Sequence, residues 1–209
     1  MTDKIFITLA VEDLLSEVVL RTILRQSKRP YQVTSCICRR GFGHLRKNIE
    51  SFNHAAKSIP IIVLTDLDRT ECAPILVREW LNAPPHRNLL FRVAVREVES
   101  WVMAHRTAFS AFLGIRKDRI PIDTDSLADP KKALLDLCAK SRKRYLREAI
   151  VPAPKSTAKV GPDYNGRLGE FVMMNWDVRE AAKNSLSLMK AFRAITSFDP
   201  VQEGVPCPR

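Results

Sequence analysis

The feature that most constrains the fold is the run PIIVLTDLDR, from Pro60 to Arg69. Its first half is a continuous series of aliphatic residues, which is typical of a central strand buried on both faces of a parallel sheet. Asp66 and Asp68 follow at the carboxyl end of this strand, where open α/β sheets bind their ligands. If the extended backbone continues through Leu67, both carboxylates face the same way. Two such carboxylates repel each other unless a cation or a proton lies between them, so the pattern predicts a site for a hard divalent ion such as Mg²⁺.

Strands and helices alternate along the first half of the chain. Patterns typical of strands occupy residues 4–11, 31–38, 60–66 and 89–95, and helical patterns occupy residues 13–26, 44–57 and 74–81, with another helix after Glu99. This alternation predicts an α/β fold with a mainly parallel sheet of about four strands and helices on both faces.

The second half of the chain changes in character. We expect an α/β core over residues 1–115, a basic and mostly helical extension packed on it over 116–198, and a flexible tail over 199–209. Within the extension, the proline- and glycine-rich segment 151–166 reads as a long loop, of the kind that is either functional or disordered. Helices are expected after it at residues 169–174 and 178–195.

The net charge of +11 over 209 residues indicates a polyanionic partner, DNA or RNA. No apolar run reaches the roughly 18 residues that a membrane span needs, and no secretory signal is recognisable at the start. The five cysteines are odd in number and form no C-x-x-C pair. A disulfide scaffold or a zinc site is therefore disfavoured, and a reducing, cytoplasmic setting is the expectation.

A third carboxylate joins the aspartate pair if the first and third strands are neighbours. Glu12 directly follows the first strand and would then emerge at the same sheet edge as Asp66 and Asp68. Three carboxylates binding Mg²⁺ or Mn²⁺ would support phosphodiester chemistry, because the ion polarises a phosphoryl oxygen and activates a water molecule. The alternative is that Glu12 only favours the dipole of the following helix.

Glu97 and Glu99 follow the fourth strand at positions i and i+2. They are a second carboxylate cluster for the same edge, and Glu99 is the better candidate for an additional catalytic residue. The alternative is a helix-starting pair, with one carboxylate solvated and the other bonded to Arg96 or a lysine.

Basic residues occur in groups that contain few acidic neighbours. Contacts from lysine and arginine to phosphates would give sequence-independent, salt-sensitive binding of nucleic acid, although a solvated helix face is the common alternative. The nucleic-acid-binding candidates are Arg39, Arg40, Arg46, Lys47, Lys143, Arg144, Lys155 and Lys159.

A glutamate after the first strand, followed by Asp-x-Asp at the end of a later strand, resembles the TOPRIM domain. The matching pieces are VEDLLSEVVL, IVLTDLD, VAVREVESWVMA, the Asp129-Pro130-Lys131 turn, GPDYN and SLSLMKAF. Together they also resemble a small TOPRIM-like family of unknown function related to OLD-type nucleases.

The resemblance implies that Glu12 is a general acid/base and that Asp66 and Asp68 hold Mg²⁺. The chain departs from the TOPRIM pattern at Asp13, where a glycine is usual, and at Glu17, which is shifted by one residue, so the role of Glu17 stays open. Fold similarity alone does not fix a reaction.

The leading hypothesis is a Mg²⁺-dependent nuclease that uses Glu12, Asp66, Asp68 and Glu99. The resemblance also suggests a role in defence against phage or mobile DNA and a separate ATPase as partner, and a homodimer is compatible with the sequence. The alternatives are a non-catalytic nucleic-acid-binding or interaction module, a nucleotidyl or phosphoryl transferase for a small substrate and, least favoured, a scaffold.

Overall fold

The structure is a computed structural model that describes residues 4–38 and 43–201. Within these residues it contains four strands, which form one sheet in the order β2-β1-β3-β4. The strands are β1 (Ile5–Val11), β2 (Tyr31–Cys38), β3 (Ile61–Asp66) and β4 (Leu89–Ala94). All neighbouring pairs are parallel. The α/β class and the parallel sheet are thus confirmed, in an arrangement compatible with a TOPRIM-like fold.

The two central strands of the sheet are β1 and β3, which pair with each other from Thr8↔Ile61 to Val11↔Leu64. The aliphatic run of β3 is buried on both faces, as its composition predicts. Because neighbouring parallel strands end at the same edge, the residues after Val11, Asp66 and Ala94 come together there.

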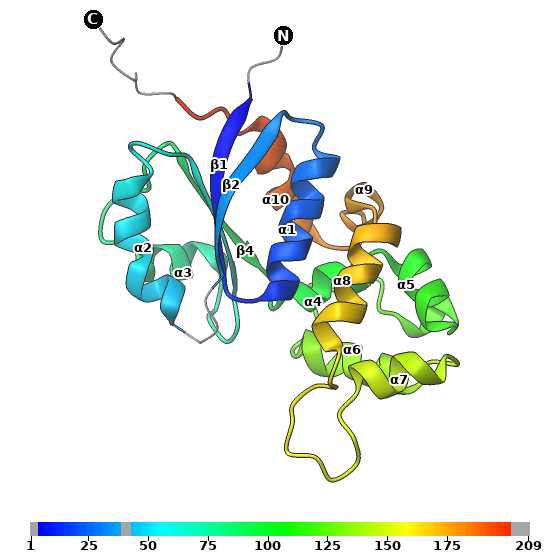
Figure 1. Cartoon of the computed structure of the whole chain (residues 1–209). Helices are drawn as coiled ribbons and strands as arrows, with labels where there is room; N and C mark the ends of the chain where they lie inside the picture. The colour runs from blue at the N-terminus through cyan, green and yellow to red at the C-terminus, as the bar shows by residue number, and fades with distance from the viewer. Residues whose placement is uncertain (1–3, 39–42, 202–209) are drawn as a thin grey trace, which may run out of the picture.

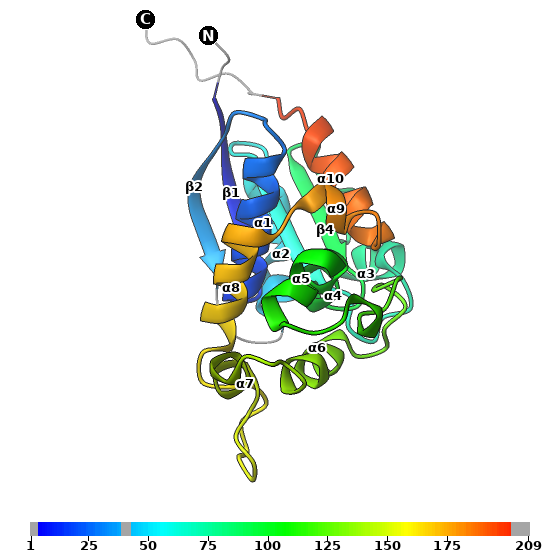
Figure 2. The ribbon, with the colours of Figure 1, turned by 90° about the vertical axis from the view of Figure 1, so that its right-hand side faces the viewer.

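Helices cover both faces of the sheet (Figures 1 and 2). On one face lie α2 (His44–Ala55) and α3 (Ala73–Trp80), whose apolar side chains pack with Ile61, Val63 and Phe91. On the other face lies α1 (Leu14–Gln26), whose buried side chains pack with Ile7, Leu9 and Ile62. Side chains therefore leave the strands alternately toward two separate apolar clusters.

The helices of the second half share the apolar cluster of α1. They are α4 (Val98–Ala104), α5 (Arg106–Leu113), α6 (Pro130–Ala139), α7 (Arg144–Ile150), α8 (Tyr164–Asn175), α9 (Val178–Ala181) and α10 (Leu186–Ser197), with a short 3₁₀ turn, η1 (Lys117–Arg119). Trp101, Phe109 and Phe171 are fully buried at the centre of this cluster. In both views α6 and α7 lie beyond the carboxyl ends of the strands (Figures 1 and 2).

Two expected boundaries in the extension are wrong. The loop ends at residue 163 because α8 already begins at Tyr164, five residues before the expected start at Gly169. At this helix start the buried Tyr164 hydroxyl donates to Glu99 at 2.7 Å, a long-range contact that the sequence pattern does not indicate. The single helix expected over 178–195 is broken between α9 and α10, where the Ser185 hydroxyl accepts from the backbone N–H of Leu188 and caps α10.

The described part of the tail is attached to the start of β4. Asn88 and Val201 exchange two hydrogen bonds of 2.8 Å between the asparagine amide and the backbone of Val201. No helix within residues 4–38 and 43–201 combines the length and the hydrophobicity that a membrane span requires.

Candidate functional site

A cavity of about 970 Å³ opens at the carboxyl edge of the sheet. Its walls come from the ends of β1 and β3, the segment between β3 and α3, and the turn before α6. Carboxylates are the most frequent polar groups of its lining, and we call it the acidic cleft. The charged residues of its lining include Glu12, Asp66, Asp68, Glu97, Arg46, Arg96 and Lys159.

Glu12 reaches from the end of β1 across to β3. Its carboxylate accepts a short hydrogen bond from the Thr65 hydroxyl and a longer one, of 3.4 Å, from the backbone N–H of Asp66. The cap of the following helix is Asp13 and not Glu12, because Asp13 Oδ1 accepts from the backbone N–H of Ser16 at 2.8 Å. Burial raises the pKa of Glu12, and the negative charges of Asp68 and Asp13 raise it further against the opposing bonds from Thr65 and Asp66.

Asp66 is the last residue of β3 and lies next to Glu12. Its Oδ1 accepts from the backbone N–H of Val98 at 3.0 Å, so the first turn of α4 holds this carboxylate in place. Burial raises the pKa of Asp66 well above its usual range, and the charges of Glu99, Glu12, Asp13 and Asp68 act in the same direction. Five carboxylates thus influence one another at this edge.

The prediction of an extended backbone through Leu67 is wrong, although Asp68 still lines the acidic cleft. The strand ends at Asp66, and Asp68 adopts a left-handed conformation with φ of 49°. The backbone N–H of Leu67 reaches the carbonyls of Ala94 and Arg96, both at 2.9 Å. The Arg96 guanidinium then donates to the carbonyls of Asp68 and Thr70, both at 3.0 Å. The turn that follows β3 is therefore held in place by the segment that follows β4.

The second carboxylate pair is divided between the surface and the interior. Glu97 lines the acidic cleft, and its Oε2 accepts from the backbone N–H of Lys131 at 2.8 Å. Glu99 does not line the cleft: it is 1% exposed, and its Oε1 contacts the Tyr164 hydroxyl at 2.7 Å and Lys131 Nζ at 3.2 Å. Within the described chain, Glu99 Oε2 is buried without a hydrogen-bond partner. Glu99 is thus an internal charge that acts on Asp66.

The basic candidates fall into three groups. Arg46 at the start of α2 and Lys159 of the 151–163 loop are exposed and line the acidic cleft. Lys47, Lys143, Arg144 and Lys155 do not line it, and Arg144 pairs with Glu148 at 2.7 Å. Arg39 and Arg40 lie outside the described residues. Glu17, whose role the sequence left open, pairs with Arg21 at 2.8 Å on the surface of α1.

Sequence reasoning missed the partners of the carboxylates. Thr65 binds Glu12, Arg96 holds the Asp68 turn, and Lys131 and Tyr164 bind Glu99. Lys131 and Tyr164 both belong to motifs that the sequence marks, the Asp-Pro-Lys turn and GPDYN, but nothing in those motifs indicates a buried glutamate as their partner.

The donors at this edge are of the type that a hard divalent ion prefers, because all are carboxylate oxygens. Burial is the main cause of the raised pKa values of Glu12 and Asp66, and the charges of neighbouring carboxylates add to it, a condition that a bound cation relieves. Within residues 4–38 and 43–201, no group of three or more His, Cys, Asp or Glu side chains is arranged to hold a metal ion. If a metal binds here, the carboxylates that line this edge are Glu12, Asp66 and Asp68, and their side chains would have to move to coordinate one ion.

Comparison with known proteins gives no relative: no protein-family model, no curated protein and no solved structure matches this chain.

Proposed function

We propose that this chain is a Mg²⁺- or Mn²⁺-dependent nuclease of the TOPRIM type, which hydrolyses phosphodiester bonds at the acidic cleft. The observation that carries the proposal is the contact of Glu12 with Thr65 and Asp66 at the carboxyl edge of the sheet. That contact brings together the glutamate and the Asp-x-Asp pair, which lie more than fifty residues apart in the sequence.

Asp66 and Asp68 would hold the ion, with Glu12 at its side. When bound, the ion would polarise the phosphoryl oxygen and activate a water molecule. The backbone N–H of Val98 fixes Oδ1 of Asp66, whereas Arg96 fixes only the backbone that carries Asp68. Asp66 is therefore the better-anchored of the two ligands. Glu12, whose pKa is raised by burial, is the carboxyl group best suited to deliver a proton to the leaving oxygen.

Arg46 and Lys159 would bind the nucleic-acid backbone on either side of the scissile phosphate. They line the acidic cleft from two separate elements, and both are exposed. Contacts of this kind favour any phosphate chain and weaken with salt, which agrees with the net charge of +11. The other exposed basic residues would extend the path along the same strand.

A non-catalytic nucleic-acid-binding module is the second candidate. The observation that favours it is that Glu12 and Asp66 already find hydrogen-bond donors within the protein. Carboxylates satisfied in this way can serve a purely structural purpose.

Cleavage of plasmid DNA, single-stranded DNA and total tRNA in Mg²⁺, Mn²⁺ or EDTA separates the two candidates. The nuclease should cut at least one substrate only with metal, and Asp66→Asn/Asp68→Asn should not cut. Glu79→Gln is the matched control because Glu79 is an exposed carboxylate of the same cleft outside the cluster. Metal-dependent cutting that survives in the double variant would refute the proposed roles, and salt-sensitive binding in EDTA without cutting would establish the binding module.

The cellular setting and the partners belong to the same proposal. Cys36, Cys72 and Cys138 are free thiols in the described chain, in keeping with the reducing cytoplasm that we propose. A separate ATPase and a homodimer are further proposals, which co-purification and the measured mass of the particle would test.

A further inference from the structure

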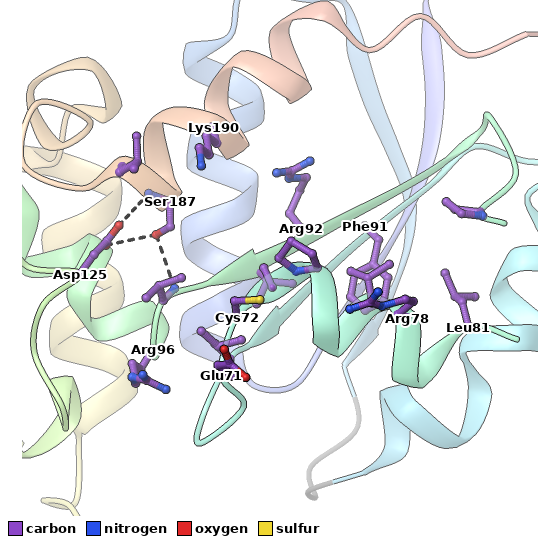
Figure 3. Close-up of a pocket in the computed structure, with 18 of the residues that line it drawn as sticks. Glu71, Cys72, Arg78, Leu81, Phe91, Arg92, Arg96, Asp125, Ser187 and Lys190 are labelled. Carbon is purple, nitrogen blue, oxygen red and sulfur yellow. Dashed lines mark hydrogen bonds between the residues drawn. The ribbon is translucent and has the colours of Figure 1, made fainter. Parts of the chain in front are cut away.

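A second and larger cavity, of about 1120 Å³, lies at the outer edge of β4 between α3 and α10 (Figure 3). We call it the edge groove. It adjoins the acidic cleft, because Leu67, Glu71 and Arg96 line both, but none of the three carboxylates of the proposed metal site lines it. Its charged lining consists of the basic residues Arg78, Arg92, Arg96 and Lys190 and the acidic residues Glu71, Asp123 and Asp125.

The backbone of β4 is open toward the edge groove. In a parallel ladder, alternate residues of a strand direct their N–H and C=O groups to one neighbour. The bonds from Ile61 N–H to the Asn88 carbonyl and from Leu67 N–H to the Ala94 carbonyl show that the even-numbered residues face β3. Phe91 and Val93, which line the groove, therefore direct their backbone groups outward.

Within the part of the chain that the structure describes, no group bonds these outward groups of Phe91 and Val93. The edge is closed at its two ends instead: Leu89 N–H donates to the His86 carbonyl at 2.8 Å, and Val95 N–H donates to Ser187 Oγ at 3.4 Å. Open edges are sites at which another strand can pair. Here helices stand on both sides of the edge, so the space left is a slot for one extended segment.

The side chains of β4 divide the slot into two parts of different chemistry. Phe91 and Val93 belong to the apolar cluster on the α3 side. Arg92 leaves the opposite face, and Figure 3 shows its guanidinium on the side of α10, from which Lys190 also extends. An added strand would present alternate side chains to these two parts.

Arg92 lacks a partner in the described structure. Its Nε is buried without a hydrogen-bond acceptor, and burial lowers the pKa of its guanidinium. An unsatisfied buried donor is costly, and a carboxylate is the acceptor that matches a guanidinium best. Lys190 extends from α10 on the same side of the groove, so two cations there favour an acidic side chain.

We propose that the edge groove receives an extended acidic segment of a partner protein, which pairs with β4 as a fifth strand. Its backbone would bond to Phe91 and Val93, with apolar side chains on the α3 side and carboxylates on Arg92 and Lys190. The β4 strand of a second copy does not fit, because it is itself flanked by α3 and α10. The proposal stands independently of nuclease activity.

Binding of labelled peptides to the full chain, followed by fluorescence polarisation, tests the chemistry. The probe is an eight-residue peptide in which three Val-Glu pairs stand between glycines, and the control peptide has lysine in place of each glutamate. The acidic peptide should bind, the basic one should not, and Arg92→Gln should weaken binding at least about tenfold. Arg87→Gln is the matched control because Arg87 is exposed on the same edge of the molecule outside the groove.

Two measurements test the strand pairing itself. Methylating the amide nitrogens of only the valines or only the glutamates should abolish binding in one case and leave it in the other, since alternate residues face β4. Hydrogen exchange at the Phe91 and Val93 amides should slow when the acidic peptide binds. Failure of the acidic peptide to bind, equal binding of both methylated forms, or an unaffected Arg92→Gln would overturn the proposal, whatever the cleavage assay shows.

Discussion

The ammonium group of Lys131 lies 3.2 Å from the carboxylate of Glu99, which is 1% exposed. Lys131 belongs to α6 and Glu99 to α4, so the pair joins the helical second half of the chain to the segment that follows β4. The charges of Glu99 and Glu97 raise the pKa of Lys131 against the opposing effect of burial. This ammonium is the cation that compensates the negative charge beneath the acidic cleft.

Lys131→Met keeps most of the side-chain packing and removes that compensation. We expect the free energy of unfolding to fall by about 1–3 kcal/mol, less than for a fully buried pair because Lys131 is partly exposed. Urea denaturation measures the change. Adding Glu99→Gln should recover much of the loss, and Lys132→Met, which removes a surface pair with Asp136, should change little. Equal effects at Lys131 and Lys132 would contradict the account.

Tyr164→Phe removes the other partner of Glu99. The Tyr164 hydroxyl is buried and donates to Oε1 of Glu99 at 2.7 Å, and a hydrogen bond to a charged group contributes roughly 1.5–3 kcal/mol. We expect a loss of stability of that size in thermal or urea unfolding. Tyr145→Phe, at a residue that is 54% exposed, is the control, and an equal loss there would show that the Glu99 contact contributes nothing.

The strands and the location of the site were predictable from the sequence because both depend on local patterns. The aliphatic run before Asp66 predicts a central strand. Glu12 directly follows β1, so its closeness to Asp66 follows once β1 and β3 are known to be neighbours. Sequence patterns also place Asp13 correctly at a helix start. They do not show that Asp13 caps this helix while the neighbouring Glu12 binds Thr65.

The rest depends on contacts between residues far apart in the sequence. Glu99 looks like a surface carboxylate at a helix start, and only the packing of α6 and α8 against α4 buries it beside Lys131 and Tyr164. The left-handed turn at Asp68 is likewise set by Arg96, from the neighbouring strand end. No periodicity in the sequence reports such distant partners.

Stability should decrease at mildly acidic pH because of His105. Burial lowers the pKa of His105, with Lys117 and Lys183 acting in the same direction and Asp177 and Glu180 against it. Its Nδ1 also accepts a hydrogen bond from the backbone N–H of Asp177 at 3.0 Å, which protonation at that nitrogen removes.

The folded state therefore binds the His105 proton less readily than the unfolded state does. The stabilisation is complete above the ordinary histidine pKa of about 6.5 and is lost as the pH falls through it toward the lower folded value. Unfolding followed from pH 7.5 to 5.0 should show a smaller decline in His105→Gln than in the unmodified chain. His54→Gln, on α2, should retain the full decline, and a decline unchanged in His105→Gln would contradict this assignment.

Binding of Mn²⁺, followed by electron paramagnetic resonance of the free ion, measures occupancy of the proposed metal site without any need for cleavage. We expect saturable binding to the unmodified chain, loss of that binding in Asp66→Asn/Asp68→Asn, and retention in Glu79→Gln. Mn²⁺ binding that is absent from the unmodified chain, or unchanged in the double variant, would contradict the assignment of a metal site to Glu12, Asp66 and Asp68.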